Sequence, residues 1–188
     1  MTTTNKTKRR AILAFMQNRP GVLNRVVSIF RRPGLNLDSL TVGRTDRPEV
    51  SRMTMVLEGT RADAQHVKRE LNRLIHVITV EDMNGTPYVT RDLALIKVQA
   101  TPESKSEILQ ICGHYRARIV DAAQSSIVVE VVGEEPEIEG LAGLLQPFGI
   151  IEMVRAGVVA MGRAENVLDT HCERSSWAEQ RFPLEKAS

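Results

Sequence analysis

The residues best suited to bind a small polar ligand lie in two short stretches near the N-terminus. The first is Asn18–Leu23, with Pro20-Gly21 at its centre, and the second begins with Asn36-Leu37. An asparagine amide can accept a hydrogen bond from an ammonium group and donate one to a carboxylate. A helix that begins after Gly21 would add N–H groups without internal partners and the positive end of its dipole. Asn36 begins the second predicted strand, which is expected beside the first, so it could reach the same mouth as Asn18. Such groups together could bind a free amino acid.

The neighbouring residues suit the same ligand. Gly21 lets a ligand approach the backbone closely. Val22, Leu23 and Leu37 could form apolar walls for a branched side chain. A plainer interpretation stays open, because Pro-Gly is a common turn, Asn18 could simply cap the helix and Asn36 could be an exposed residue at a strand start. The candidate effector site consists of Asn18, Gly21, Val22, Leu23, Asn36 and Leu37.

Groups able to carry out covalent chemistry do not stand out in the sequence. The four histidines have no metal-ligand spacing with one another or with the two cysteines, Cys112 and Cys172. The serine pairs lack a nucleophile-elbow context, and neither GxGxxG nor a P-loop occurs. We therefore expect no catalytic residue, no metal site and no cofactor in this chain, which favours a sensor over an enzyme.

Composition limits the partners further. The 188 residues are 42% hydrophobic but only 4% aromatic, and the net charge is +2 with both signs well mixed. A basic run at Lys6–Arg10 is local and is interpreted as a solvated arm, so nucleic-acid binding is not expected. No apolar run reaches the roughly 18 residues of a membrane span, and a signal-peptide core is lacking. Two distant cysteines favour a reducing cytoplasm.

Six elements are predicted in the first half, in the order β-α-β-β-α-β. The helix expected at 22–30 has Val22, Val26 and Phe30 four residues apart, with Leu23 and Val27 on the same face, and Gly34 as its stop signal. A second helix begins after Thr60 as N-cap and buries Val67, Leu71 and Leu74. Strands are expected at 10–16, 35–43, 51–57 and 77–80.

The same order recurs after a break at Asn84–Pro87. Strands are expected at 93–100, 119–123, 127–132 and 150–159. One helix opens at Thr101-Pro102, and a second covers 134–145 despite two glycines. Their inward residues are expected to be Ile108, Leu109, Cys112 and Tyr115 in the first helix, and Leu141, Leu144 and Leu145 in the second.

The chain is thus predicted to be of the α+β class, with two tandem ferredoxin-like βαββαβ domains. We expect the first domain at 9–83, a linker at 84–90, the second domain at 91–163 and a flexible tail at 164–188. Each domain is about 75 residues and can bury only a modest core. Small size and open sheet edges favour a homodimer.

Five stretches carry a resemblance to a known family. They are Gly34–Val42, Thr45-Asp46, Ser51–Thr54, Arg91–Val98 and Arg155–Val159. At these residues the chain resembles the small, regulatory subunit of acetolactate synthase (acetohydroxyacid synthase), over roughly 9–163. The resemblance implies that the first half is an ACT domain, which binds amino acids at a dimer interface, and that the second is an ACT-like domain.

The same resemblance implies a function. In this family the effector is typically valine, sometimes with leucine or isoleucine, and it acts as a feedback inhibitor. The subunit activates a separate large catalytic subunit that carries thiamine diphosphate, magnesium and FAD, and it is not an enzyme by itself. By resemblance, Asn18, Gly21 and Asn36 map onto effector-contacting positions. Pro33 and Leu35 depart from the family pattern. The alternative is a stand-alone amino-acid-sensing ACT protein that regulates another enzyme or a promoter.

Overall fold

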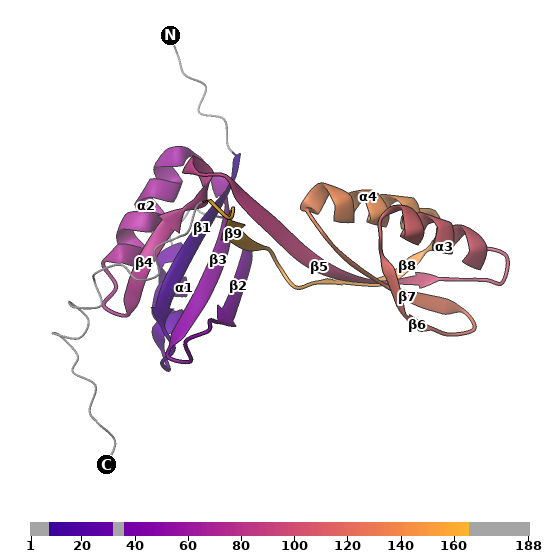
Figure 1. Cartoon of the computed structure of the whole chain (residues 1–188), viewed down its shortest axis with the longest axis horizontal. Helices are drawn as coiled ribbons and strands as arrows, with labels where there is room; N and C mark the ends of the chain where they lie inside the picture. The colour runs from indigo at the N-terminus through magenta and orange to yellow at the C-terminus, as the bar shows by residue number, and fades with distance from the viewer. Residues whose placement is uncertain (1–7, 32–35, 166–188) are drawn as a thin grey trace, which may run out of the picture. The chain divides into compact units, whose positions relative to one another are not determined.

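The computed structural model describes residues 8–31 and 36–165, and within them the chain forms two units (Figure 1). Unit 1 comprises the described residues up to Tyr88 together with those from Gly162 onward, and unit 2 spans Val89–Met161. Each unit contains an antiparallel sheet with two helices, as the α+β prediction requires, and the fold class is confirmed. The expected stop at Gly34, the departures at Pro33 and Leu35 and nearly all of the tail lie outside the described residues.

Unit 1 follows the predicted β-α-β-β-α-β order. Its sheet has the strand order β2-β3-β1-β4, which is the ferredoxin-like arrangement. The elements are β1 (Lys8–Gln17), α1 (Val22–Ser28), a short 3₁₀ turn η1 (Ile29–Arg31), β2 (Asn36–Arg44), β3 (Val50–Gly59), α2 (Arg61–Asn72), β4 (Val77–Asp82) and a second 3₁₀ turn η2 (Met83–Gly85).

The main core of unit 1 lies between its sheet and its helices. Alternate residues of β1 and β3 point toward the helices, because successive side chains of a strand face opposite sides. Val26 of α1 and Val67 and Leu71 of α2 pack against them and are fully buried, as predicted for α2. Leu23 and Val27 of α1 do not join this core; they are 44% and 37% exposed. The prediction that these two fill the buried face was wrong.

Strand β1 is buried on its other face as well. Ala11, Leu13 and Phe15 form a second cluster with Met83, and Tyr88 packs against it. A strand covered on both sides carries apolar residues without alternation. This explains the unbroken apolar run at 11–16, which gave no period-2 signal.

Helix α2 begins with a complete capping box. The Thr60 hydroxyl accepts a hydrogen bond from the Asp63 backbone N–H at 3.3 Å, and the Asp63 carboxylate accepts one from the Thr60 N–H at 2.7 Å. Two otherwise unpartnered backbone donors are thereby satisfied. Hydrogen bonds from the Thr60 backbone and then from its hydroxyl lower the pKa of Asp63 below the ordinary value of 3.8.

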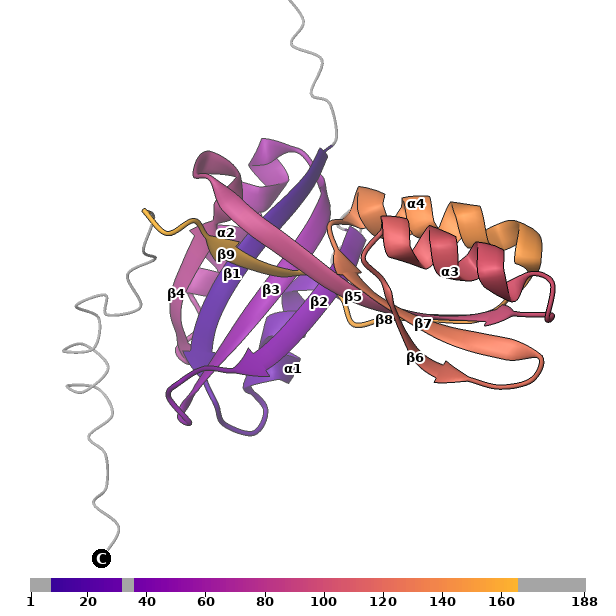
Figure 2. The ribbon, with the colours of Figure 1, turned by 45° about the vertical axis from the view of Figure 1, so that its right-hand side comes forward.

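Unit 2 repeats the plan with one added strand. Its sheet has the order β6-β7-β5-β8, and β9 pairs with β5. Helices α3 and α4 lie side by side on one face of this sheet (Figures 1 and 2). The elements are β5 (Tyr88–Gln99), α3 (Lys105–His114), β6 (Arg118–Ala122), β7 (Ser126–Gly133), α4 (Glu135–Leu145), the 3₁₀ turn η3 (Gln146–Phe148), β8 (Ile150–Arg155) and β9 (Val159–Gly162).

Several details of unit 2 differ from the predictions. The strand expected at 150–159 is two strands, because Gly157 adopts φ 91° and interrupts the ladder. Helix α3 begins at Lys105 and not at Thr101-Pro102, although Lys105 N–H already bonds the Thr101 carbonyl at 3.1 Å. Leu109 and Leu144 are 52% and 48% exposed and lie outside the core. The expected linker 84–90 contains most of η2 and the first three residues of β5.

The two glycines of α4 have different surroundings. A Cβ at Gly140 would lie 2.7 Å from the Tyr115 hydroxyl and 3.3 Å from its ring, whereas a Cβ at Gly143 would meet nothing within 4 Å. Gly140 therefore lets Tyr115 pack across α4. Gly143 has no such contact to explain it.

We expect Gly143→Ala to stabilise the protein by about 0.5–1 kcal/mol, because alanine favours a helix over glycine. Gly140→Ala gains the same propensity but must displace the Tyr115 ring, so it should be less stable than Gly143→Ala by about 1 kcal/mol or more. Urea unfolding of the two variants measures this difference. Equal stabilisation by both would show that the Tyr115 contact imposes no constraint.

The capping box predicts a specific pH dependence. Because the pKa of Asp63 is lowered in the folded state, its contribution to stability is present above pH 3.8 and is lost as the pH falls through the folded pKa. Thr60→Ala should cost about 1 kcal/mol at neutral pH and should flatten the decline of stability below pH 4. Urea unfolding between pH 2 and 7 measures both, and Thr86→Ala, at an exposed position, serves as the control.

Candidate functional site

Asn18 lies at the end of β1 and is held by the turn between β2 and β3. Its backbone N–H bonds the Glu49 carbonyl at 2.7 Å, and its side-chain Nδ2 donates to the Pro48 carbonyl at 2.9 Å. Its Oδ1 accepts no hydrogen bond from any residue that the structure describes. The side chain is exposed, so this oxygen is available to an ammonium group.

Thr45 organises the turn that holds Asn18. Its hydroxyl oxygen accepts a hydrogen bond from the Arg47 N–H at 3.1 Å and lies 3.1 Å from the Val50 carbonyl. Its own N–H bonds the same carbonyl at 3.2 Å. The Pro48 carbonyl that receives the Asn18 amide is thus part of an ordered turn.

Gly21 forms the N-cap of α1 in a left-handed conformation, with φ 81° and ψ −11°. A Cβ added there would meet nothing within 4 Å, so glycine is required by the backbone conformation and the space beside it is open. The N–H groups of Leu23 and Asn24 in the first turn have no partner among the described residues, and the turn contains no acidic side chain. The start of α1 can therefore receive an anionic group.

The three apolar residues of the candidate site have different surroundings. Val22 is 4% exposed and belongs to the core of unit 1, and Leu37 packs against the same core. Leu23 alone is substantially exposed, at 44%. Within one chain, Leu23 is therefore the member of this group whose side chain is free to contact a ligand.

Asn36 does not reach the loop of Asn18 within one chain. Strand β2 pairs with β3 and not with β1, and Asn36 lies opposite Glu58, whereas Gln17 lies opposite Val50. Eight residues of β3 separate these positions, which is roughly 26 Å of strand. The expectation that both asparagines share one mouth of a single domain was wrong, because β2 is not beside β1 and the two residues lie at opposite ends of the sheet.

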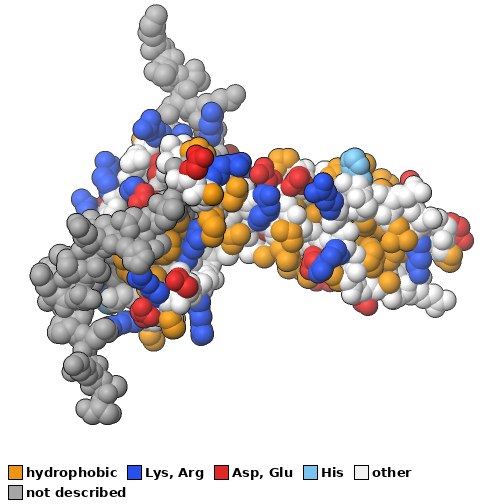
Figure 3. Space-filling view, in the orientation of Figure 1, with side chains coloured by type: hydrophobic (Ala, Val, Ile, Leu, Met, Phe, Trp, Pro, Cys, Tyr) orange, Lys and Arg blue, Asp and Glu red, His pale blue; other side chains and the backbone are white. Residues whose placement is uncertain are grey.

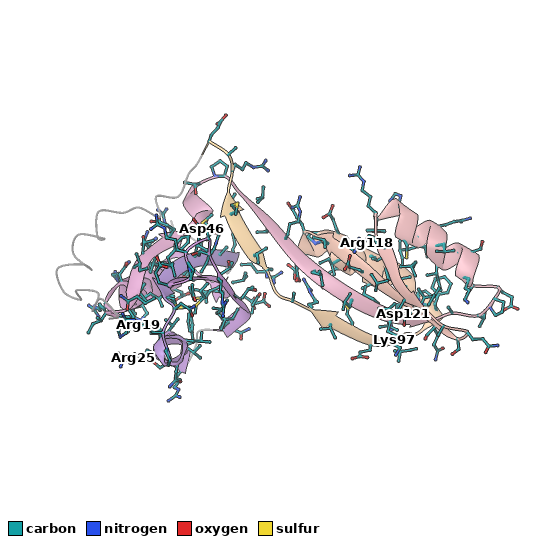
Figure 4. All side chains as sticks on the ribbon, turned by 60° about the horizontal axis from the view of Figure 1, so that its bottom comes forward. Arg19, Arg25, Asp46, Lys97, Arg118 and Asp121 are labelled. Atoms are coloured by element: carbon teal, nitrogen blue, oxygen red, sulfur yellow. The ribbon has the colours of Figure 1, made fainter. Side chains whose placement is uncertain are left out.

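Arginine side chains lie near the loop. Arg19 and Arg25 are exposed and lie at the same end of unit 1 (Figure 4), and Arg44 ends β2 opposite Ser51 near that end. Figure 3 shows Lys and Arg interspersed with Asp and Glu on the face in view. Arg19 and Arg25 favour a carboxylate ligand at the loop, and Asp46 and Glu49 of the neighbouring turn offset part of their charge. Arg19 and Arg25 were not among the predicted site residues, although their position in and just after the Pro-Gly loop is visible in the sequence.

Arg52 and Cys112 are titratable groups with shifted pKa values that are not part of the candidate site. Arg52 sits over the Phe15 ring at 5.7 Å, and burial lowers the pKa of its guanidinium. Cys112 is 3% exposed, and burial raises the pKa of its thiol, which disfavours the reactive thiolate. Among the described residues, no group of three or more His, Cys, Asp and Glu could hold a metal ion. None of the helices in this described part is long and apolar enough to cross a membrane.

Comparison with known proteins identifies both units. Residues 12–79 match the family model described as an AHAS small subunit-like ACT domain, and residues 91–164 match the model described as small subunit of acetolactate synthase. A probable acetolactate synthase small subunit of Archaeoglobus fulgidus is 43% identical over 155 residues, which cover 82% of this chain and 97% of that protein. The chain belongs to the acetolactate synthase small subunit family.

Other acetolactate synthase small subunits are similar to this chain over most of its length. That of Bacillus subtilis is 42% identical over 157 residues and covers 82% of this chain and 91% of its own length. The crystal structure of the acetolactate synthase small subunit from Thermotoga maritima superposes with a TM-score of 0.77 at 30% identity, covering 85% of this chain and 99% of that one. The family predicted from these sequence stretches is confirmed.

The conformation of Gly21 predicts a stability difference between two exposed glycines. Gly21→Ala places a Cβ in the left-handed region and should cost about 1–2 kcal/mol. Gly43, in β2, also has open space around its Cβ position but no positive φ, so Gly43→Ala should be neutral or stabilise by up to about 1 kcal/mol. Thermal and urea unfolding measure the pair. Equal stability of the two variants would contradict the conformation at Gly21.

Proposed function

We propose that this chain is the regulatory subunit of an acetolactate synthase, which activates a large catalytic subunit and confers feedback inhibition by valine. The observation that carries the proposal is the agreement of both units with small subunits of this enzyme, together with an open helix start at Gly21 whose first turn contains no acidic side chain. The name small subunit, borne by the relatives, supports a catalytic partner. In this proposal the chain performs no covalent chemistry, and thiamine diphosphate, magnesium and FAD belong to that partner.

The proposed effector site is completed by a second copy of the chain. Asn18 and Asn36 lie at opposite ends of one sheet, and β2 is an edge strand of that sheet. If two β2 strands pair antiparallel about Leu40, Asn36 of the second copy comes opposite Arg44. That position is at the end of the sheet where the Asn18 loop lies. The two asparagines of one site then come from different copies.

Exposed apolar residues support this dimer. Leu23 and Val27 of α1 are 44% and 37% exposed, and Val42 of β2 is 41% exposed. Pairing of β2 with a second copy would remove a free strand edge, which natural proteins rarely leave open. It would also remove these side chains from water, which is favourable at about 25 cal/mol per Å² of apolar surface.

A bound amino acid would then bridge two copies. Its carboxylate would meet the start of α1 and the nearby arginines, its ammonium group would meet the Asn18 oxygen, and Leu23 would contact its side chain. To alter catalysis, the amino acid must bind one arrangement of the dimer on the catalytic subunit better than another. Couplings of this kind are typically about 1–3 kcal/mol.

A stand-alone amino-acid sensor that controls another enzyme or a promoter is the second candidate, and an amino-acid site in an ACT domain would serve it equally well. The two candidates differ in partner. Activation of a purified acetolactate synthase catalytic subunit by this chain supports the proposal. Retention on promoter DNA at moderate salt, without such activation, would support the alternative.

The effector is tested by calorimetric titration with valine, leucine and isoleucine, with alanine as the control ligand. We expect saturable heat with valine that is lost in Gly21→Asp, because a carboxylate beside the helix start repels that of the ligand. Gly85→Asp adds the same charge in η2, which follows β4 at the edge of the sheet opposite β2, and should still bind. Unchanged affinity in Gly21→Asp would overturn the site assignment.

A mixing experiment tests whether two copies share each site. Asn18→Ala and Asn36→Ala should each abolish most valine binding. In a mixed dimer, one site carries both substitutions and the other carries neither, so random mixing should restore about a quarter of the sites. Recovery measured by titration after mixing supports a shared site. Absence of recovery, with mixed dimers shown by native mass spectrometry, would place both asparagines of a site on one chain or remove one of them from it.

A further inference from the structure

Asp92 is a buried carboxylate in unit 2 that the proposed effector site does not use. It lies in β5 and is 3% exposed. One oxygen accepts a hydrogen bond from Arg155 Nε at 2.7 Å, and the other accepts one from the Gly157 backbone N–H at 3.0 Å. Both partners lie near the end of β8, so one carboxylate joins β5 to the chain that leaves the sheet there.

The Asp92 carboxylate lies where the backbone hydrogen bonds between β8 and β5 end. Arg155 pairs with Ala94, and the Ala156 N–H bonds the Leu93 carbonyl at 2.9 Å. The next residue, Gly157, has φ 91°, and its N–H turns to the Asp92 side chain instead of a main-chain acceptor. Pairing with β5 resumes in β9, at Val159–Gly162. Asp92 therefore bridges the interruption between β8 and β9.

Arg155 extends this contact to a helix. Its NH1 group donates to Glu139 of α4 at 2.7 Å and lies 4.0 Å from Glu135. A guanidinium can make these contacts together because it presents several donors in a fixed plane. The pair formed by Asp92 and Arg155, with its contacts to Gly157 and Glu139, is called here the Asp92 clasp. It fastens β5, β8, the Gly157 loop and α4 to one another.

The position of the clasp along the chain gives it a second consequence. The chain passes from unit 1 to unit 2 after Tyr88, at the start of β5, and returns at Gly162, at the end of β9. Both passages are made by strands that pair with each other. Any influence carried along the covalent chain between the units must pass through these two strands, and the clasp holds the chain immediately before the start of β9 against β5.

We propose that the Asp92 clasp sets the register of β9 on β5 and that this register relays amino-acid binding in unit 1 to unit 2. The relay rests on the proposed function, whereas the register does not. Asp92 and Arg155 are positioning residues in this account and touch no ligand. Burial of the Asp92 carboxylate suits this task, because loss of its Arg155 partner would leave a buried charge unpaired.

The test compares Asp92→Asn with a matched control in the full chain. Asparagine keeps the shape and can still accept from Gly157, but it removes the charge that holds Arg155. The control is Glu130→Gln, which neutralises the carboxylate of an ion pair in the same sheet, 2.7 Å from Arg118, whose side chain is 73% exposed. Glu139→Gln removes only the outer contact of Arg155 and keeps the test informative if Asp92→Asn does not fold.

The first measurement is amide hydrogen exchange of the chain alone. In Asp92→Asn, exchange at Gly157 and in β9 should rise by about tenfold or more, while α3 exchanges as in the wild type. Glu139→Gln should produce a smaller rise at the same residues, and Glu130→Gln should produce none. Unchanged exchange at Gly157 and β9 in both clasp variants would overturn the assigned register role.

The second measurement uses the complex with the catalytic subunit. Asp92→Asn should bind valine within about threefold of wild-type affinity but should lose most of the inhibition that valine causes, because binding and relay are separate steps. Glu130→Gln should be inhibited like the wild type. Full inhibition of Asp92→Asn, despite faster exchange in β9, would overturn the relay. If no branched-chain amino acid inhibits the wild-type complex, both the proposed effector and the relay are overturned. The hydrogen-exchange comparison would still test whether the clasp sets the register of β9.

Discussion

The antiparallel pairing of β1 with β3 is the constraint on which unit 1 depends. It runs without a break from the pair Lys8–Gly59 to the pair Gln17–Val50. Because both faces of β1 are buried, a slip of one residue would move Leu13 and Phe15 into the core that holds Ala14 and Met16, and the different side-chain volumes disfavour it. The same register fixes Asn18 at one end of the sheet and, through β3, Asn36 at the other.

This separation determines how many copies of the chain the proposed amino-acid site needs. An amino acid has two charged ends and one side chain, and a single copy of unit 1 offers only part of what it needs: a helix start, an amide oxygen and the exposed side chain of Leu23. The second asparagine can join only from another molecule. Dimerisation and ligand binding would then be coupled by geometry, since each site would span both copies.

Each unit has a glycine with positive φ at a change of chain direction, and the two glycines have different hydrogen-bonding surroundings. In unit 1, Gly21 in the left-handed conformation turns the chain from β1 into α1 and leaves N–H groups free for a ligand. In unit 2, Gly157 has a similar φ, but its N–H is taken by Asp92. The N–H groups at the start of α1 can therefore bond a ligand, whereas the Gly157 N–H is already bonded within unit 2. The first arrangement thus suits recognition, and the second suits the positioning of a strand.

Hydrophobic periodicity, turn residues and caps determined the class of fold, the order of the elements and the Thr60 cap, because these depend on neighbours within a few residues in the chain. Periodicity names a helix face only approximately, so Leu23, Val27, Leu109 and Leu144 at the margins of their faces were assigned inward and are exposed. Which strand lies beside which, and therefore which end of the sheet holds Asn36, depends on pairing between distant segments. Only the tertiary structure could place the two asparagines apart, and only it could bring Asp92 to Arg155 across 63 residues, because no local spacing records such contacts.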